Sequence, residues 1–113
     1  AHAGGSASIF VNASTWALML TGKKENMQAA IKELKAGIAA DPEYPVGYGF
    51  LAQAYGQLGD MARADLATAD MNYYSGKLQQ AKIFATRAQK QMKPGSPDWL
   101  RAQDIINARK PKK

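Results

Sequence analysis

The sequence predicts an all-α protein of about six helices, arranged as antiparallel helical hairpins. The 113 residues are rich in alanine and poor in β-branched residues, a composition that favours helices. The stretch from Tyr48 to Ala67, YGFLAQAYGQLGDMARADLA, has apolar or small residues at three- and four-residue steps before a Gly59-Asp60 break. This pattern is typical of two helices joined by a tight turn.

Each helix is expected from its periodicity and from the residues that end it. The predicted helices cover residues 8–20, 25–40, 45–58, 61–75, 78–92 and 97–108. Gly59 closes the third helix because glycine tolerates the left-handed conformation, and Asp60 caps the fourth by accepting from its free amides. Gly76 ends the break between the fourth and fifth helices. Ser96 is the expected N-cap of the last helix, and Pro97 fits its first turn because the missing amide hydrogen has no helical partner there.

The chain is expected to form one helical domain over residues 8–108, between a flexible segment at 1–7 and a flexible basic tail at 109–113. Apolar residues make up 46% and charged residues 21% of the sequence, as in an ordinary globular protein. The formal net charge is +6, and the tail alone holds Arg109 and three lysines. We interpret this tail as a solvated terminus.

The composition excludes several kinds of chemistry for this chain. It has no cysteine for disulfides, thiol catalysis or thiolate-bound zinc, and its single histidine, His2, lies at the start. No run of about 18 apolar residues is present, so we expect no membrane insertion. Asp65 and Asp70 share one helix and are interpreted as a solvated face or as partner contacts rather than an acid/base pair. We predict no catalytic residue, no metal and no cofactor.

An internal repeat appears at a spacing of 34 residues, which separates Ala30 from Ala64. The pattern Tyr48-x-x-Leu51-Ala52-x-x-Tyr55, followed by Gly59-Asp60 and Ala64, resembles the tetratricopeptide repeat (TPR). This resemblance implies a short right-handed superhelix of stacked hairpins. The first hairpin lacks the signature residues and is expected to be an atypical end unit. Thr68 also departs from the family, and we expect a close helix approach there.

The last helix is expected to cap the array. Repeat arrays need such a cap because each unit buries its apolar face only on a neighbour. Trp99, Leu100 and Ile106 are the residues expected to cover the open end of the stack.

The stretch from about Ala30 to Ile106 is similar to the C-terminal repeat region of bacterial periplasmic M48-type zinc metallopeptidases. The similarity rests on three motifs: AYGxxGDxxxADLA, YxxGxxxxAxxxAxxA and the closing PGSPxWLRAQDI. It implies a periplasmic interaction module that contacts substrates, partners or the peptidase domain of the same protein. The zinc-binding His-Glu-x-x-His of that peptidase is absent, so this chain is not expected to be an enzyme. The alternative is a free-standing, cytoplasmic TPR adaptor or assembly factor.

By analogy with this repeat family, the first helix of each hairpin lines a concave, peptide-binding surface. The candidate partner-binding residues are Asn12, Trp16, Met19, Gly49, Gln53 and Gly56, with Tyr73 and Tyr74 as an extension. Trp16 has an alternative interpretation as a core residue, and Gln53 is expected to be exposed. A lysine-based clamp for a peptide's terminal carboxylate is not expected, because this set contains no lysine.

A nucleic-acid binder is the third hypothesis. It rests on the basic tail and on Arg87, Lys90 and Lys93. No aromatic residues are interleaved with that basic cluster, so stacking on bases is not supported. We therefore expect a protein or peptide partner and no nucleic acid.

Overall fold

The computed structural model describes residues 13–109, and these residues form six helices and no strand. The helices are α2 (Ala13–Leu20), α3 (Lys24–Ala40), α4 (Pro45–Gln57), α5 (Met61–Tyr74), α6 (Leu78–Gln89) and α7 (Pro97–Ile106). The prediction of an all-α fold is confirmed. The predicted start of the first helix at residue 8, the segment 1–7 and most of the tail lie outside the described residues.

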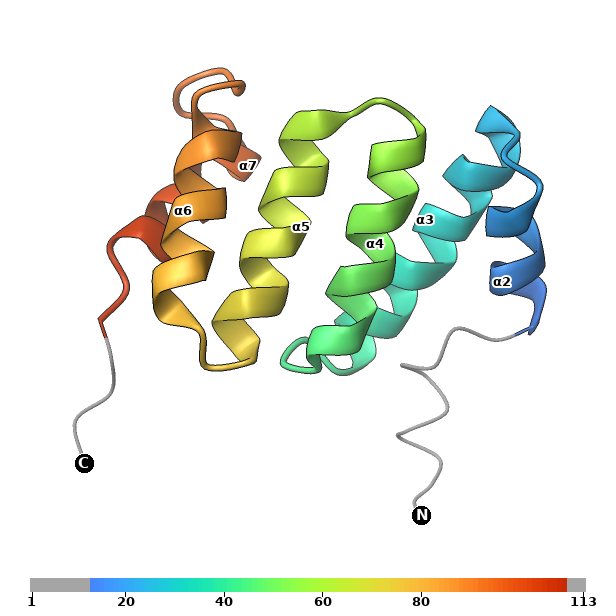
Figure 1. Cartoon of the computed structure of the whole chain (residues 1–113), viewed down its shortest axis with the longest axis horizontal. Helices are drawn as coiled ribbons and strands as arrows, with labels where there is room; N and C mark the ends of the chain where they lie inside the picture. The colour runs from blue at the N-terminus through green and yellow to red at the C-terminus, as the bar shows by residue number, and fades with distance from the viewer. Residues whose placement is uncertain (1–12, 110–113) are drawn as a thin grey trace, which may run out of the picture.

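The helices run alternately up and down in a row from α2 to α6, and α7 lies behind α6 in Figure 1. Each helix packs on the next one along the chain, and α7 contacts α5 as well as α6. The helix α5 is therefore the central element, because it touches α4, α6 and α7.

The predicted turn at Gly59-Asp60 is confirmed. Gly59 has a φ of +79°, and the Asp60 amide donates to the Tyr55 carbonyl at 3.0 Å, which closes α4. The Asp60 side chain then accepts from the Arg63 amide at 3.1 Å and caps α5. Two consecutive residues thus satisfy backbone groups of both helices.

The break after α5 has the same construction. Gly76 has a φ of +80°, and the Lys77 amide donates to the Asn72 carbonyl at 2.8 Å. The start of α7 also agrees with the sequence, because the Ser96 hydroxyl accepts from the Trp99 amide at 3.3 Å and Pro97 stands in the first turn.

Among residues 13–109, two hydrophobic clusters form the core, and α5 contributes to both. The first joins α2 to α5 and contains Met19, Met27, Ala30, Ile31, Leu34, Leu51, Ala54, Tyr55, Ala64 and Ala67. The second joins α5 to α7 and contains Leu66, Ala69, Ala81, Ala85, Ala88, Ala102 and Ile105. Alanines dominate the second cluster, so α5, α6 and α7 pack with short side chains between them. The largest fully buried side chains are Met27 and Ile105.

The predicted end cap is only partly correct. Leu100 is 50% exposed, whereas Ala102 and Ile105 are fully buried, and Trp99 and Ile106 are half-buried. The reason is the rotation of α7 about its axis: Ala102 and Ile105 share one face of the helix at a three-residue spacing. That face points at α5 and α6, and Leu100 is turned away from it.

Candidate functional site

Of the predicted partner-binding positions in the first hairpin, one is buried and another cannot be placed. Asn12 lies outside the described residues. Met19 is only 3% exposed and packs in the core with Met27 of α3, so its assignment to a binding surface is wrong. The apolar side of α2 faces α3, and Met19 is on that side.

Trp16 lies at the edge of the molecule rather than in the core. Its side chain is 42% exposed, and its ring meets the ring of Phe50 edge-to-face with centroids 5.5 Å apart. An edge-to-face pair is a favoured aromatic geometry. The contact joins α2 to α4 and leaves part of the indole open to a partner.

Three predicted residues of the second hairpin share one side of α4. Gly49, Gln53 and Gly56 follow each other at steps of four and three residues, which places them on one helix face. Gln53 is exposed, as expected from the sequence. Phe50 is adjacent to this set, so Trp16, Gly49, Phe50, Gln53 and Gly56 form one surface, which we call the α4 face.

The two glycines of the α4 face have different surroundings. A Cβ at Gly49 would stand 3.1 Å from the Met71 sulfur of α5, so glycine there permits close packing of α4 on α5. Within the described part of the chain, a Cβ at Gly56 would meet nothing within 4 Å, and the φ of Gly56 is not in the left-handed region. Neither packing nor backbone conformation explains Gly56, although glycine in a helix is less stable than alanine by roughly 0.5–1 kcal/mol.

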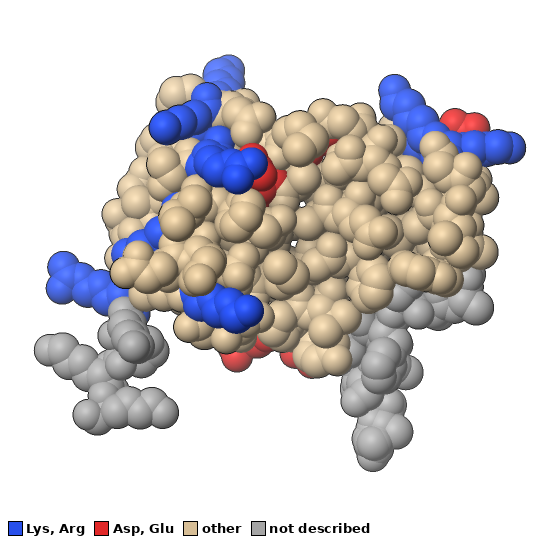
Figure 2. All heavy atoms as spheres, viewed as in Figure 1, with Lys and Arg blue, Asp and Glu red and all other residues tan. Residues whose placement is uncertain are grey.

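The α4 face carries no charge. Neither α2 nor α4 contains a charged residue. Figure 2 shows a broad area without Lys, Arg, Asp or Glu over α4, whereas basic side chains gather on the α6 side of the molecule and at its opposite upper end. Covering this surface would therefore remove no charged side chain of α2 or α4 from water.

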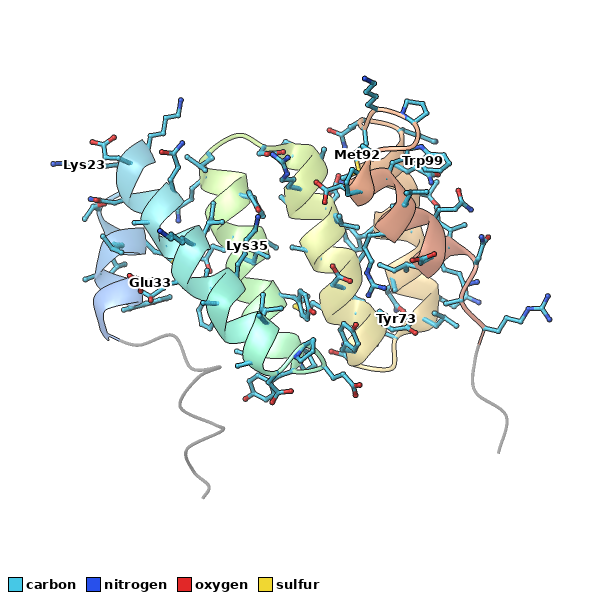
Figure 3. All side chains as sticks on the ribbon, turned by 180° about the vertical axis from the view of Figure 1, so that it is seen from behind. Lys23, Glu33, Lys35, Tyr73, Met92 and Trp99 are labelled. Carbon is cyan, nitrogen blue, oxygen red and sulfur yellow. The ribbon has the colours of Figure 1, made fainter. Side chains whose placement is uncertain are left out.

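Tyr73 does not extend the α4 face, which corrects the prediction. It is visible from behind the molecule in Figure 3, near the C-terminal end of α5. Its ring packs edge-to-face on Tyr74 at 5.0 Å and lies 5.4 Å from the Arg101 guanidinium. Tyr74 in turn stacks on Tyr48 at 5.3 Å, so these tyrosines fasten α5 to α4 and α7.

A groove that the sequence did not indicate lies on the opposite side of α4 from Gln53. In Figure 3, α3 and α7 are nearest the viewer and flank α4 and α5. Two adjoining hollows, of about 570 Å³ and 170 Å³, share Lys35, Arg63 and Asp98 in their walls. We call them together the α3–α7 groove. The smaller hollow is also lined by Leu51, Tyr55, Leu66, Ala67, Asp70 and Arg101.

Asp65 and Asp70 are not on a solvated face, so the interpretation of these two residues as a solvated face is wrong. Taken as whole residues, Asp65 and Asp70 are 6% and 8% exposed, respectively. Asp65 is 3.4 Å from the Arg87 guanidinium and accepts from the Gln91 side chain at 3.1 Å. Asp70 accepts two hydrogen bonds from Arg101, at 2.6 and 2.9 Å. The two carboxylates therefore join α5 to α6 and to α7.

The pKa of Asp70 in its pair with Arg101 is not lowered, as it would be in an ion pair at the surface; it is raised. Burial raises the pKa of the Asp70 carboxyl, and this effect outweighs the charge and hydrogen bonds of Arg101, which lower it. Burial lowers the pKa of Arg101, but Asp70 together with Tyr74 and Tyr48 raises it overall. The difference follows from exposure: the Asp70 side chain is 11% exposed and that of Arg101 is 35% exposed, so loss of water weighs more on the carboxylate. Burial, with the nearby Asp70 charge, also raises the pKa of Tyr48.

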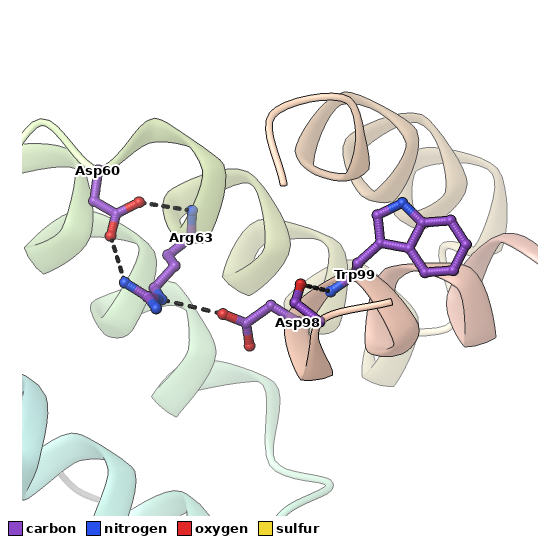
Figure 4. Close-up of polar contacts among 5 residues, drawn as sticks. Asp60, Arg63, Asp98 and Trp99 are labelled. Carbon is purple, nitrogen blue, oxygen red and sulfur yellow. Dashed lines mark hydrogen bonds and ion pairs between the residues drawn. The ribbon is translucent and has the colours of Figure 1, made fainter. Parts of the chain in front are cut away.

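Arg63 connects the N-terminal ends of α5 and α7 (Figure 4). Its guanidinium is 3.0 Å from the Asp60 carboxylate and 3.1 Å from the Asp98 carboxylate. Hydrogen bonds to Asp60 and Asp98 raise the pKa of Arg63. Asp98 is 35 residues from Arg63, so helical periodicity within one segment could not have indicated this contact.

Within residues 13–109, no group of three His, Cys, Asp or Glu side chains could hold a metal ion. No helix in the same part of the chain is both long and apolar enough to cross a membrane. Comparisons with protein-family models, with curated proteins and with solved structures found no match for this chain.

Proposed function

We propose that this chain is a non-catalytic module that binds a protein or peptide. The observation that carries the proposal is the α4 face, an uncharged helical surface that presents Trp16, Phe50 and Gln53 side by side with a glycine at position 56. Aromatic rings supply apolar contact area, and a side-chain amide can pair with a peptide backbone.

Gly56 supports a ligand that approaches the helix closely. No neighbour among residues 13–109 occupies the space beside it, and an alanine there would favour the helix. A glycine that weakens a helix without a packing reason is expected where another backbone lies against it. Gly49 does not carry the same argument, since Met71 accounts for it.

The finer proposal is that the module is the C-terminal TPR region of a periplasmic M48-type metallopeptidase. It is supported by the motifs AYGxxGDxxxADLA and PGSPxWLRAQDI, whose helix-ending and helix-starting residues act as caps in the structure. Its ligand would be a substrate, a partner or the peptidase domain itself. The alternative is a free-standing TPR adaptor. A gene that encodes a secretion signal and His-Glu-x-x-His upstream of Ala1 would favour the peptidase, and a start codon close to Ala1 would favour the adaptor.

Site-specific photo-crosslinking tests the binding function. A photoreactive amino acid at Gln53 should crosslink to a polypeptide in cells, and mass spectrometry then identifies the contacted segment. The matched control is the same amino acid at Gln79, an exposed glutamine of α6. With the identified segment as ligand, Gln53→Ala should weaken binding without lowering the melting temperature. Absence of a crosslink at Gln53, or equal products at both positions, would contradict the proposal.

A further inference from the structure

We propose that the α3–α7 groove is a second binding site, distinct from the α4 face, and that it takes an acidic segment of a polypeptide. Leu51 and Tyr55 of α4 line the groove, whereas Gln53 points to the other side of the same helix. A ligand in the groove therefore does not compete for the α4 face.

The expected charge of the ligand follows from which charged groups of the groove are already paired. Its three carboxylates, Asp60, Asp70 and Asp98, are each bonded to an arginine. Lys35 and Lys93 also line it, and neither has an ion-pair partner among residues 13–109. A basic ligand would find every carboxylate of the groove paired, whereas an acidic ligand would meet two ammonium groups that pair with no carboxylate among residues 13–109.

The total charge of the groove agrees with this assignment. Its walls hold four cations, Lys35, Arg63, Lys93 and Arg101, against three carboxylates. The helices α5 and α7 both begin at the groove, and the N-terminus of a helix carries roughly half a positive charge. Asp60 and Asp98, which both pair with Arg63, lie at the N-terminal ends of α5 and α7. The positive ends of these helices therefore offset part of the negative charge of the two carboxylates.

The shape and apolar lining of the groove favour a polypeptide over a simple inorganic ion. The larger hollow, of about 570 Å³, is in the range of about 300–1,000 Å³ typical of ligand pockets. Tyr55, Leu51 and Leu66 form an apolar floor of the smaller hollow next to Lys35, although each of them is no more than 8% exposed and presents only a small area. The Lys35 ammonium is 5.9 Å from the centre of the Tyr55 ring, where it is held beside the apolar floor. Carboxylates near the two lysines with an apolar side chain between them would fill both hollows.

The groove is held in shape by contacts that do not involve the two lysines. Arg63 bridges Asp60 and Asp98, and Arg101 bridges Asp70 and the tyrosines of α5. The walls formed by α5 and α7 are therefore fixed before a ligand binds, which reduces the ordering cost of binding. Lys35 and Lys93 can be changed without removing any of these contacts.

An array of short peptides that differ in net charge tests the proposal on the whole chain. We expect the acidic peptides to bind, with amide shifts in the NMR spectrum at Tyr55, Leu66 and Arg63 but not at Gln53. The double reversal Lys35→Glu with Lys93→Glu should weaken the acidic peptides by about tenfold or more, because attraction becomes repulsion. The matched control is Lys24→Glu with Lys90→Glu, which changes the net charge equally at two exposed lysines outside the groove.

Several results would overturn the assignment. The assignment is wrong if no acidic peptide binds, if the bound peptides are neutral or basic, or if the two double variants weaken binding equally. If a single-stranded RNA oligonucleotide binds the groove more tightly than the acidic peptides do, the ligand is a phosphate-bearing molecule and not an acidic polypeptide. Unchanged crosslinking at Gln53 in the Lys35→Glu, Lys93→Glu variant shows that the α4 face is a separate site.

Discussion

The packing of α4 can be tested by placing an alanine at two of its glycines. A Cβ at Gly56 would meet no described residue within 4 Å, whereas a Cβ at Gly47 would stand 3.0 Å from Cγ1 of Ile38 on α3. Alanine favours a helix over glycine by roughly 0.5–1 kcal/mol, so Gly56→Ala should raise the free energy of unfolding by about that amount. At Gly47 the same gain is opposed by overpacking, which costs about 1–3 kcal/mol, so the net effect should be a loss of up to about 2.5 kcal/mol.

The difference between the two variants isolates the overpacking, because the gain in helix propensity is common to both. Urea unfolding followed by circular dichroism should therefore place Gly47→Ala below Gly56→Ala by about 1–3 kcal/mol. The contact with Ile38 is checked in an Ile38→Ala background, where Gly47→Ala should no longer be destabilising. Equal stability of the two glycine variants, or a Gly47 effect that persists without Ile38, would refute the reasoning.

Two further predictions concern α7 and its attachment to α5. Arg101→Met should raise the pKa of Asp70 still further, because the charge and the hydrogen bonds of the Arg101 guanidinium lower that pKa. Carbon-detected NMR titration of the Asp70 carboxyl measures this pKa. An unchanged or lower value in the variant would contradict the pairing. Because the folded-state pKa of Asp70 is raised, its titration contributes stability that is present below its unfolded pKa and is lost as pH rises through the folded pKa, and Asp70→Asn should remove that pH dependence. Ile105→Ala should lower the free energy of unfolding by about 2–5 kcal/mol, while Leu100→Ala, at a half-exposed position, should cost much less.

The helices and their ends could be predicted from the sequence because their causes are local. Gly59, Asp60, Gly76 and Ser96 make their hydrogen bonds to groups no more than five residues away, as written in the chain. Gln53 was placed correctly on an exposed side of its helix for the same reason. Helical periodicity specifies which residues share a face.

Which face meets which neighbour was decided only in the tertiary structure. Periodicity did not reveal that Met19 turns into the core or that Tyr73 joins Arg101 on the far side of the molecule. The buried pair of Asp70 with Arg101 and the bridge from Arg63 to Asp98 link residues 31 and 35 positions apart. Both contacts form only because α7 has a particular rotation and position on α5, and the packing of Ala102 and Ile105 sets that orientation. The amino-acid sequence by itself thus determined the six helices and their caps, while only the three-dimensional packing decided which charges are buried and where the groove opens.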